Sequence, residues 1–236
     1  RSLPPADYRP ALLAAYDDGE WVALLLDDVE GRHPDLDDPA DADAVRGVVR
    51  AQARSLSDAA GSIPVATEDM AARVRRWHDL VAGATEHEAA RAALPAWWHR
   101  DEPALLARIA ALADRISVAA WCHLDVRDDN LLIRPDGRAV ILDWGMSCPG
   151  PSWLDELVLD LHVVDRPELD ASVAERPAYD DTDDIERDTT DMVLGIGASL
   201  AVMAEVAQQP GLPWLTEFRR RESRRVLAGA RRRLGL

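Results

Sequence analysis

The sequence contains no lysine, because all 27 of its basic residues are arginine. A GC-rich coding sequence, which favours Arg and Ala over Lys, explains this absence without reference to function. Whatever its origin, the absence of lysine limits the chemistry that the chain can perform. Any function that depends on a lysine side chain cannot be supplied by these 236 residues.

Cysteine and long apolar runs are also scarce. The two cysteines, Cys122 and Cys148, lack the spacing of a metal-binding pair, and nothing indicates the disulfide framework of a secreted protein. We therefore expect two thiols. No run approaches the ~20 apolar residues of a membrane span, and the N-terminus has no apolar stretch of the kind found in signal peptides. The sequence predicts a cytoplasmic protein.

The chain carries a net charge of -16. Nucleic acids and anionic membranes are bound through clustered cations on the contact face, so this charge disfavours both as partners. It suits a cationic ligand. The length and ordinary apolar fraction predict a globular protein with a sizeable core.

The pattern of apolar residues predicts a short β-rich beginning followed by a mostly helical chain, hence an α+β protein. Residues 10–31 contain two apolar runs around Asp17, Asp18 and Gly19, which is typical of a β-hairpin with an Asp-Gly turn. Spacings of three and four residues predict helices. They are expected at 41–56, 67–81 (with a capping box that begins at Thr67), 103–116 (apolar on most sides and therefore buried), 152–164, 191–207 and 218–235.

A second hairpin is predicted in "LLIRPDGRAVIL", residues 131–142. Apolar residues flank Asp136-Gly137, a strong signal for a two-residue turn. Counting outward from that turn pairs Asn130 with Asp143. Directly opposed residues on antiparallel strands have Cβ atoms ~5 Å apart, so the two polar side chains are expected to meet at the open end of the hairpin.

The residues at this open end predict phosphoryl transfer. An Asn and an Asp without Cys or His partners are hard oxygen donors, which suit Mg²⁺ shared with substrate phosphates. Asp125 lies five residues before Asn130 and can orient a hydroxyl and accept its proton. The alternative is that Asn130 and Asp143 only cap strand ends and that Asp125 lies in a polar turn.

"HLDVRDDN" (residues 123–130) and "ILDWG" (141–145) resemble the catalytic loop and metal-binding motif of the protein-kinase-like fold. Within that fold the sequence is most similar to the aminoglycoside phosphotransferase family of small-molecule kinases. No Ala-Pro-Glu motif follows, and "PGPSWLDEL" comes at once, as in that family. "WVALLLDDVEGRHP" resembles the family's hinge between lobes, and the C-terminal arginine-rich segment resembles its last helix.

The resemblance implies roles for individual residues. Asp125 would be the catalytic base, Asn130 and Asp143 would bind Mg²⁺ and through it ATP, and His123 would support the loop. Arg127 stands where protein kinases often have a Lys that touches the transferred phosphate, and a guanidinium can do the same electrostatic work. An equal alternative is that Arg127 is a surface residue paired with a neighbouring Asp, either Asp128 or Asp129.

The resemblance also implies a nucleotide-binding hinge and a division of the chain. Leu26 would be the gatekeeper, and the backbones of Asp27 and Val29 would contact the adenine edge. Residues 1–31 would be a remnant of the N-terminal β-lobe with the hinge, and residues 32–236 the helical C-lobe. The family's glycine-rich lid and lysine are missing from these residues. We expect them in an N-terminal extension of a longer protein, and a degenerate enzyme is the alternative.

Together these features predict an ATP-dependent O-phosphotransferase for a hydroxylated small molecule, with an aminoglycoside-type acceptor favoured. Alternatives are a kinase for a sugar, choline, homoserine or macrolide, an inactive kinase-like binding module, and a metal-dependent phosphohydrolase that uses His123, Asp125 and Asp143. A hydrolase would need water-activating ligands in place of Asn130. The oligomeric state and any antibiotic-resistance phenotype are not predicted.

Other residues allow two interpretations each. The tryptophans either line a substrate cavity or anchor the core, and we favour the core. They are Trp97, Trp98, Trp153 and Trp214. The acidic run 180–191 either recruits an amine-bearing substrate or is a solvated loop or helix start, which we favour. Asp155 resembles an acidic position that follows the family's metal motif, with either a structural or a substrate-side role.

Overall fold

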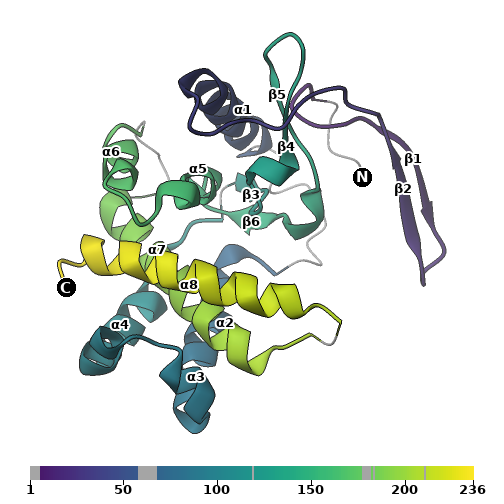
Figure 1. Ribbon diagram of the computed structural model, residues 1–236. Helices are drawn as coiled ribbons and strands as arrows, with labels where there is room; N and C mark the ends of the chain where they lie inside the picture. Colours follow the sequence, from purple (N-terminus) through teal and green to yellow (C-terminus); the bar gives the residue numbers. More distant parts are fainter. Residues whose placement is uncertain (1–5, 58–67, 119, 177–181, 183, 210) are drawn as a thin grey trace. The chain divides into compact units, whose positions relative to one another are not determined.

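The computed structural model describes residues 6–57, 68–118, 120–176, 182, 184–209 and 211–236 (Figure 1). The chain forms two compact units, each built from two segments. The first unit comprises residues 1–66 and 119–159, and the second comprises residues 67–118 and 160–236. Every residue with a predicted catalytic or cofactor role lies in the first unit. The separate prediction of a boundary at residue 31 stays a prediction.

The first unit combines short two-stranded sheets with two helices. Strand β1 (Leu12–Asp17) pairs with β2 (Val22–Leu26), β3 (Ala120–Cys122) with β6 (Cys148–Gly150), and β4 (Leu131–Ile133) with β5 (Ala139–Ile141), all antiparallel. The helices are α1 (Pro39–Ser57) and α5 (Leu154–Asp160). Short 3-10 turns, η2 (Asp128–Asn130) and η3 (Trp144–Met146), lie at the ends of the β4–β5 hairpin.

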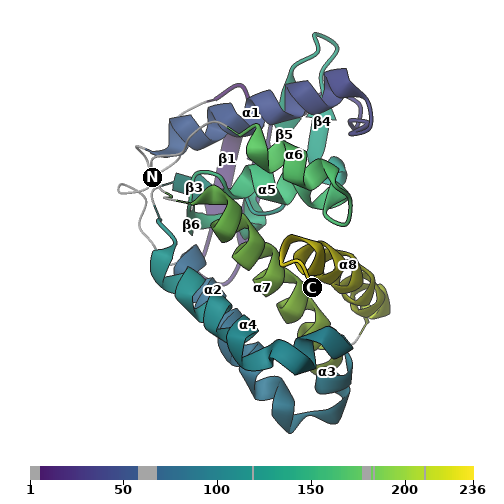
Figure 2. The same ribbon diagram turned by 90° about the vertical axis from the view of Figure 1, so that its left-hand side faces the viewer.

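The core of this unit lies between α1 and the β4–β5 hairpin, whose strands run across the direction of the helix in Figure 2. Val45 and Val49, one helical turn apart on α1, are buried against Leu131, Ile133 and Ile141 of the hairpin. Alternation along β4 puts Leu131 and Ile133 on the same face. The helix thus fixes the hairpin that follows the predicted catalytic loop.

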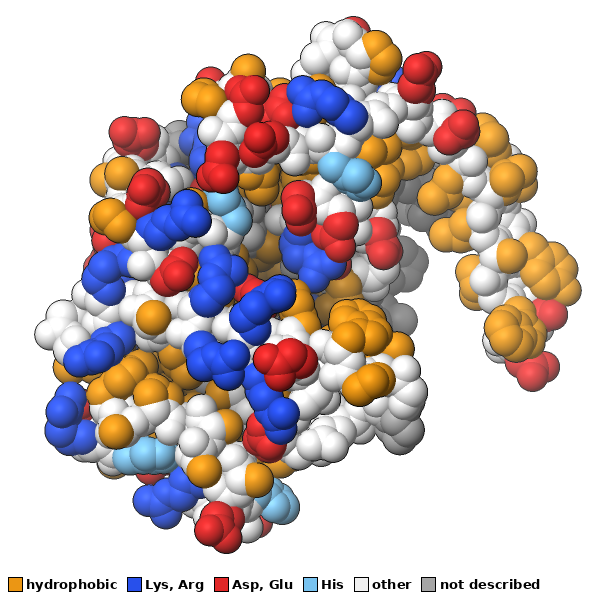
Figure 3. Space-filling view, in the orientation of Figure 1, with side chains coloured by type: hydrophobic (Ala, Val, Ile, Leu, Met, Phe, Trp, Pro, Cys, Tyr) orange, Lys and Arg blue, Asp and Glu red, His pale blue; other side chains and the backbone are white. Residues whose placement is uncertain are grey.

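The predicted hairpin at residues 10–31 is confirmed as β1–β2. Its connection runs from Asp18 to Trp21, longer than a two-residue turn. The Asp18 carboxylate accepts the Glu20 and Trp21 backbone N–H groups, and Gly19 takes a positive φ of 86°. Large apolar side chains remain exposed along both strands, as the orange side chains in Figure 3 show. Leu13 is 61% exposed and Leu25 60%.

The second unit is entirely helical within the residues that are described. It contains α2 (Met70–Ala82), η1 (Gly83–Glu86), α3 (Glu88–Ala92), α4 (Ala96–Arg115), η4 (Leu161–Val163), α6 (Glu168–Ala174), α7 (Ile185–Val206) and α8 (Pro213–Arg233). Helix α7 packs against α2, α4 and α8. At Gly197 of α7 a Cβ would lie 2.9 Å from Leu227 Cγ of α8, so glycine permits this close packing.

Helix α7 is the hydrophobic centre of this unit. Among the helices of the described residues, it is the one that is long and apolar enough to cross a membrane. The search for uninterrupted apolar runs in the sequence did not detect it. However, 72% of its apolar window is buried inside the structure. A core helix surrounded by other helices has this character.

Three helix predictions need correction. The second helix is capped by Asp69, whose carboxylate accepts the Ala72 N–H, and Thr67 lies outside the described residues. Helix α4 starts at Ala96, earlier than the predicted 103, and tolerates Pro103 in its interior. The helix was predicted to be buried on most sides, but it buries only one face, which includes Ile109. Its remaining positions are partly or fully exposed.

The acidic run 180–191 is a helix start, as predicted, but part of it is not solvated. Helix α7 begins within the run, and Asp188 and Asp191 are 4% and 2% exposed. Arg115 lies within 3.0 Å of Asp188 and 2.7 Å of Asp191, and Arg108 lies within 2.7 Å of Asp191. These acids neutralise arginines of α4. Residues 177–181 and 183 of this region lie outside the description.

Candidate active site

The β4–β5 hairpin is present, but its register differs by one residue from the prediction. Leu131 pairs with Ile141 and Ile133 with Ala139, so that the loop has three residues between Arg134 and Arg138. Gly137, with φ of 82°, is the left-handed residue that such loops require. Asn130 consequently opposes Leu142, whose N–H it accepts at 2.8 Å, and not Asp143. The predicted pairing of Asn130 with Asp143, and of Pro135 with Arg138, is wrong.

Asp155 anchors the start of the catalytic loop. Its Oδ2 accepts the His123 backbone N–H at 2.7 Å and its Oδ1 accepts the Leu124 N–H at 2.8 Å. Leu124 has φ of 68°, a left-handed conformation that costs a non-glycine residue roughly 1–2 kcal/mol. The two hydrogen bonds hold the loop in this conformation. Asp155 is therefore a positioning residue, which resolves its two predicted roles in favour of the structural one.

Asp155 is 3% exposed, and Gln52 of α1 also donates to its Oδ2, at 2.8 Å. Burial raises the pKa of Asp155 above its usual range, whereas the backbone N–H donors and the Gln52 amide oppose that shift. Because all three partners are donors, the site is built for the ionised carboxylate. No feature of the sequence around Gln52 pointed to this contact, because the two residues are far apart along the chain.

His123 connects the catalytic loop to the Asp143 motif, in keeping with its predicted supporting role. The ring is fully buried and is bonded as the Nε2–H tautomer. Nε2 donates to the Leu142 carbonyl at 2.7 Å, and Nδ1 accepts the Asp125 N–H at 3.2 Å. The Trp144 ring packs edge-to-face against it, with centroids 4.9 Å apart. One side chain thus fixes the backbone on both sides of the site.

The predicted base, Asp125, lies beside Asn130 and Arg127. Asn130 Nδ2 donates to both the backbone carbonyl and Oδ2 of Asp125, each at 2.9 Å. Arg127 Nε lies 3.3 Å from Asp125 Oδ1, and Arg127 Nη2 lies 2.6 Å from Asp129. The Asp125 side chain is 30% exposed. The structure thus shows the predicted Arg–Asp129 pair, and it also brings Arg127 to the predicted base.

The donor atoms of Asn130 and Asp143 fit a magnesium ion. Because both Asp125 atoms are acceptors, the Asn130 amide must turn its nitrogen toward them, which leaves Oδ1 for a cation. Asp143 is left-handed, with φ of 51°, and its Oδ1 accepts the Gly145 N–H at 3.3 Å. Within the described residues no group of three or more His, Cys, Asp or Glu side chains can hold a metal. Two oxygen ligands completed by substrate phosphates are what Mg²⁺ commonly uses.

Of the predicted hinge residues, Leu26 is the last residue of strand β2, and Asp27 and Val29 lie in the segment that follows it. Leu26 is 46% exposed, and the Asp27 N–H donates to the Ala11 carbonyl at 2.9 Å. Of the Asp27 backbone groups, the carbonyl is therefore the one left for a ligand. Val29 lies two residues further along the same segment.

The segment after the hinge is hydrogen-bonded to the β4–β5 hairpin. Arg32 and Ile133 exchange backbone hydrogen bonds of 3.0 and 2.7 Å. His33 Nδ1 lies 3.0 Å from both the Asp128 and Leu131 carbonyls. A Cβ at Gly31 would lie 2.9 Å from the Ile133 carbonyl oxygen, so this approach requires glycine. The sequence did not indicate these links, which keep the hinge close to Asn130.

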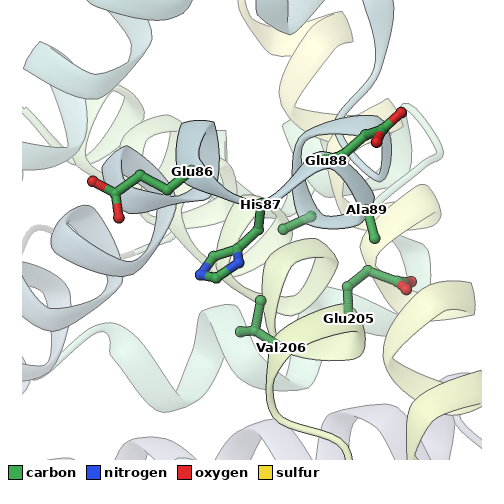
Figure 4. A pocket seen from close by; sticks show the side chains of 7 residues that line it. Glu86, His87, Glu88, Ala89, Glu205 and Val206 are labelled. Atoms are coloured by element: carbon green, nitrogen blue, oxygen red, sulfur yellow. The ribbon is translucent and has the colours of Figure 1, made fainter.

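A separate pocket of about 480 Å³ lies in the second unit, where α3 and η1 meet the end of α7 (Figure 4). Its carboxylates are Glu86, Glu88 and Glu205, and His87 points toward Val206 at its floor. Glu205 is already paired with Arg220 at 2.8 Å. None of the predicted site residues lines this pocket.

The tryptophans divide between core and surface. Trp98 and Trp153 are 0% and 1% exposed, which confirms them as core residues. The prediction is wrong for Trp214, which is 62% exposed. Trp97 is partly buried and packs against Trp98 with ring centroids 6.3 Å apart.

The fold and the loop geometry are those of the protein-kinase-like class. A model of the phosphotransferase enzyme family, APH, matches residues 7–182, more than half of the chain. The chain belongs to this family. This confirms the predicted phosphotransferase activity and the resemblance to this family that the sequence motifs indicated. No match was found among curated proteins.

Two solved structures show the same fold. An aminoglycoside phosphotransferase from Alicyclobacillus acidocaldarius is similar over 97% of this chain and 77% of that one, with 16% identity and a TM-score of 0.57. The choline kinase LicA from Streptococcus pneumoniae is similar over 94% of this chain and 74% of that one, with 16% identity and a TM-score of 0.56. At this identity the likeness shows the protein-kinase-like α+β fold, as predicted.

Proposed function

We propose that this protein is an ATP-dependent O-phosphotransferase for a hydroxylated small molecule. The observation that carries the proposal is the arrangement at the catalytic loop. Asp125 is fixed through its backbone by His123 and through its side chain by Asn130, yet its carboxylate remains partly exposed. A carboxylate held in place and open to solvent is suited to meet a substrate hydroxyl.

In the proposed reaction Asp125 accepts the hydroxyl proton as the acceptor oxygen bonds to the γ-phosphorus. The bond from that phosphorus to the β,γ-bridging oxygen breaks, and ADP leaves. Arg127 lies beside Asp125 Oδ1 and supplies positive charge near the transferred group. Positioning and electrostatic stabilisation account for most catalysis in such reactions.

Asn130 Oδ1 and Asp143 would hold Mg²⁺ in this site. The ion would neutralise the negative charge that develops on the leaving phosphate oxygen. The two residues lie at the open end of the β4–β5 hairpin, Asn130 directly before β4 and Asp143 two residues after β5, and α1 supports the hairpin from its buried side.

For nucleotide binding we propose the hinge, with the backbones of Asp27 and Val29 on the adenine edge and Leu26 as gatekeeper. The Asp27 carbonyl is the group that its hydrogen bond to Ala11 leaves available. We further propose that residues 1–31 belong to a larger β-lobe with a glycine-rich turn and a lysine. The support is the apolar surface of β1 and β2, since Leu13, Trp21 and Leu25 are 60–71% exposed.

An aminoglycoside-type acceptor is the favoured substrate class, and the net charge of -16 supports a cationic one. Choline is the second candidate. It is also cationic, and the choline kinase is nearly as similar in fold as the aminoglycoside phosphotransferase. A binding module without activity would share the fold but would not release ADP.

The test is ADP release by the full-length protein with Mg·ATP and a panel of aminoglycosides, macrolides, sugars and amino alcohols. We expect turnover with a cationic polyhydroxylated acceptor, and weaker acceptor binding as salt is raised. Turnover on a protein substrate alone would show that the substrate class is wrong. Phosphate release without a nucleotide would favour the hydrolase instead.

A further inference from the structure

Cys122 and Cys148 are directly opposed in the β3–β6 strand pair. Directly opposed residues of antiparallel strands point to the same face, with Cβ atoms ~4.5–5.5 Å apart. A disulfide requires Cα atoms ~4.4–6.8 Å apart and Cβ atoms ~3.5–4.5 Å apart. The register therefore places the two thiols where a small movement of either strand brings them into bonding range.

We propose that Cys122 and Cys148 are a modification site, which a hydroperoxide converts to a reversible disulfide that slows phosphoryl transfer. One thiolate attacks the peroxide O–O bond, becomes a sulfenic acid and releases water or an alcohol. The second thiolate then attacks that sulfur, the S–S bond forms, and the sulfenic hydroxyl leaves as water with a proton. Two thiols are oxidised for each peroxide reduced.

Burial selects the oxidant. Cys122 and Cys148 are 2% and 0% exposed, and Cys122 Sγ donates to the Pro151 carbonyl at 3.2 Å. A bulky disulfide reagent is therefore excluded from the closed structure. A small hydroperoxide can enter during local opening, and strands of only three residues each have few backbone hydrogen bonds to lose.

The position of the pair links oxidation to the active site. Cys122 directly precedes His123 and Leu124, whose N–H groups bind Asp155, and Cys148 follows the 143–147 segment. An S–S bond of ~2.05 Å would hold the two sulfur atoms closer together than unbonded atoms can lie. The adjoining strands must absorb that movement, and β3 ends at Cys122, two residues before the left-handed Leu124 and three residues before Asp125.

The experiment treats full-length protein with hydrogen peroxide and reads two signals. The first is a peptide that joins residues 116–127 to the segment beginning at Ala139 after tryptic digestion without reductant. The second is kcat, which we expect to fall about tenfold or more and to recover with dithiothreitol, since small displacements of catalytic groups are costly. The activity signal rests on the proposed function, whereas the peptide signal does not.

The single variants Cys122→Ala and Cys148→Ala serve as controls. Each should form no joined peptide and should keep its activity in peroxide. Equal inactivation of wild type and variants, or oxidation of either cysteine to a sulfinic acid without a joined peptide, would overturn the proposal. If an alanine variant does not fold, wild type trapped with iodoacetamide before and after oxidation decides the same question, because both cysteines must lose alkylation together.

Discussion

Replacement of Asp155 by Asn tests whether this buried residue positions the catalytic loop. Both carboxylate oxygens accept backbone N–H groups, Oδ2 from His123 and Oδ1 from Leu124. An Asn side chain has one acceptor oxygen, so in either orientation its NH₂ group faces a backbone N–H. Hydrogen bonds to charged groups contribute ~1.5–3 kcal/mol, and an unsatisfied buried donor costs ~1–3 kcal/mol. We therefore expect a loss of about 2–4 kcal/mol in the free energy of unfolding.

The same substitution should lower activity in protein that remains folded. The left-handed Leu124 loses the contact that holds it, and Asp125 is the next residue. Relaxation of the loop displaces the base, and a misplacement of ~1 Å can cost ~10²-fold in rate. We expect kcat to fall about 10²-fold at saturating ATP and acceptor, with the affinity for Mg·ATP changed much less.

Glu156→Gln is the matched control for this prediction. Glu156 is the next residue along α5, is 1% exposed and forms ion pairs with Arg50 at 2.7 Å and Arg46 at 3.7 Å, both on α1. Urea denaturation and steady-state kinetics should show that the control loses stability and keeps kcat. An Asp155→Asn protein with wild-type kcat, or a control that loses kcat equally, would refute the positioning role.

Two further predictions concern single carboxylates. Asp143→Asn should weaken Mg·ATP binding about 10–100-fold in a calorimetric titration, because a charge-assisted contact is worth ~1.5–3 kcal/mol. The variant should remain folded, because the only hydrogen bond of the Asp143 side chain in the described structure is the one it accepts from Gly145. Unchanged affinity would remove Asp143 from the metal site. The Arg32 guanidinium and the Asp35 N–H lower the pKa of Asp41 to about 2, so its stabilisation is complete above the unfolded value of ~3.9 and is lost as pH falls through about 2. The difference in Tm between wild type and Asp41→Asn should therefore be largest at neutral pH and shrink toward zero as the pH falls below about 2, and a constant difference would contradict this.

The sequence allowed the family, the fold class and most helices to be predicted, because the motif at residues 123–145 and the apolar periodicity are local signals. It misplaced the hairpin by one residue. An Asp-Gly pair fits both a two-residue turn and the last part of a three-residue loop, and the packing of Leu131 and Ile133 against α1 decides between them.

Contacts between distant segments could not be predicted in this way. Asp155 meets Gln52 across about a hundred residues, and the Asp188 and Asp191 carboxylates are buried because arginines of α4 reach them. In the sequence alone both acids lie within an acidic run that is typical of a solvated surface. The partner that neutralises an acid is a property of the fold.

The measurement that tests the account most directly is the kcat of full-length Asp125→Asn at saturating Mg·ATP and acceptor. The Asp125 carboxylate is bonded to Asn130, lies beside Arg127 and remains partly exposed. An Asn at this position can still accept the Asn130 amide but cannot take up the substrate proton. We predict that the variant folds and binds Mg·ATP as wild type does and that kcat falls ~10²–10⁴-fold. A kcat within a few-fold of wild type would contradict the assignment of the base and the proposed mechanism with it.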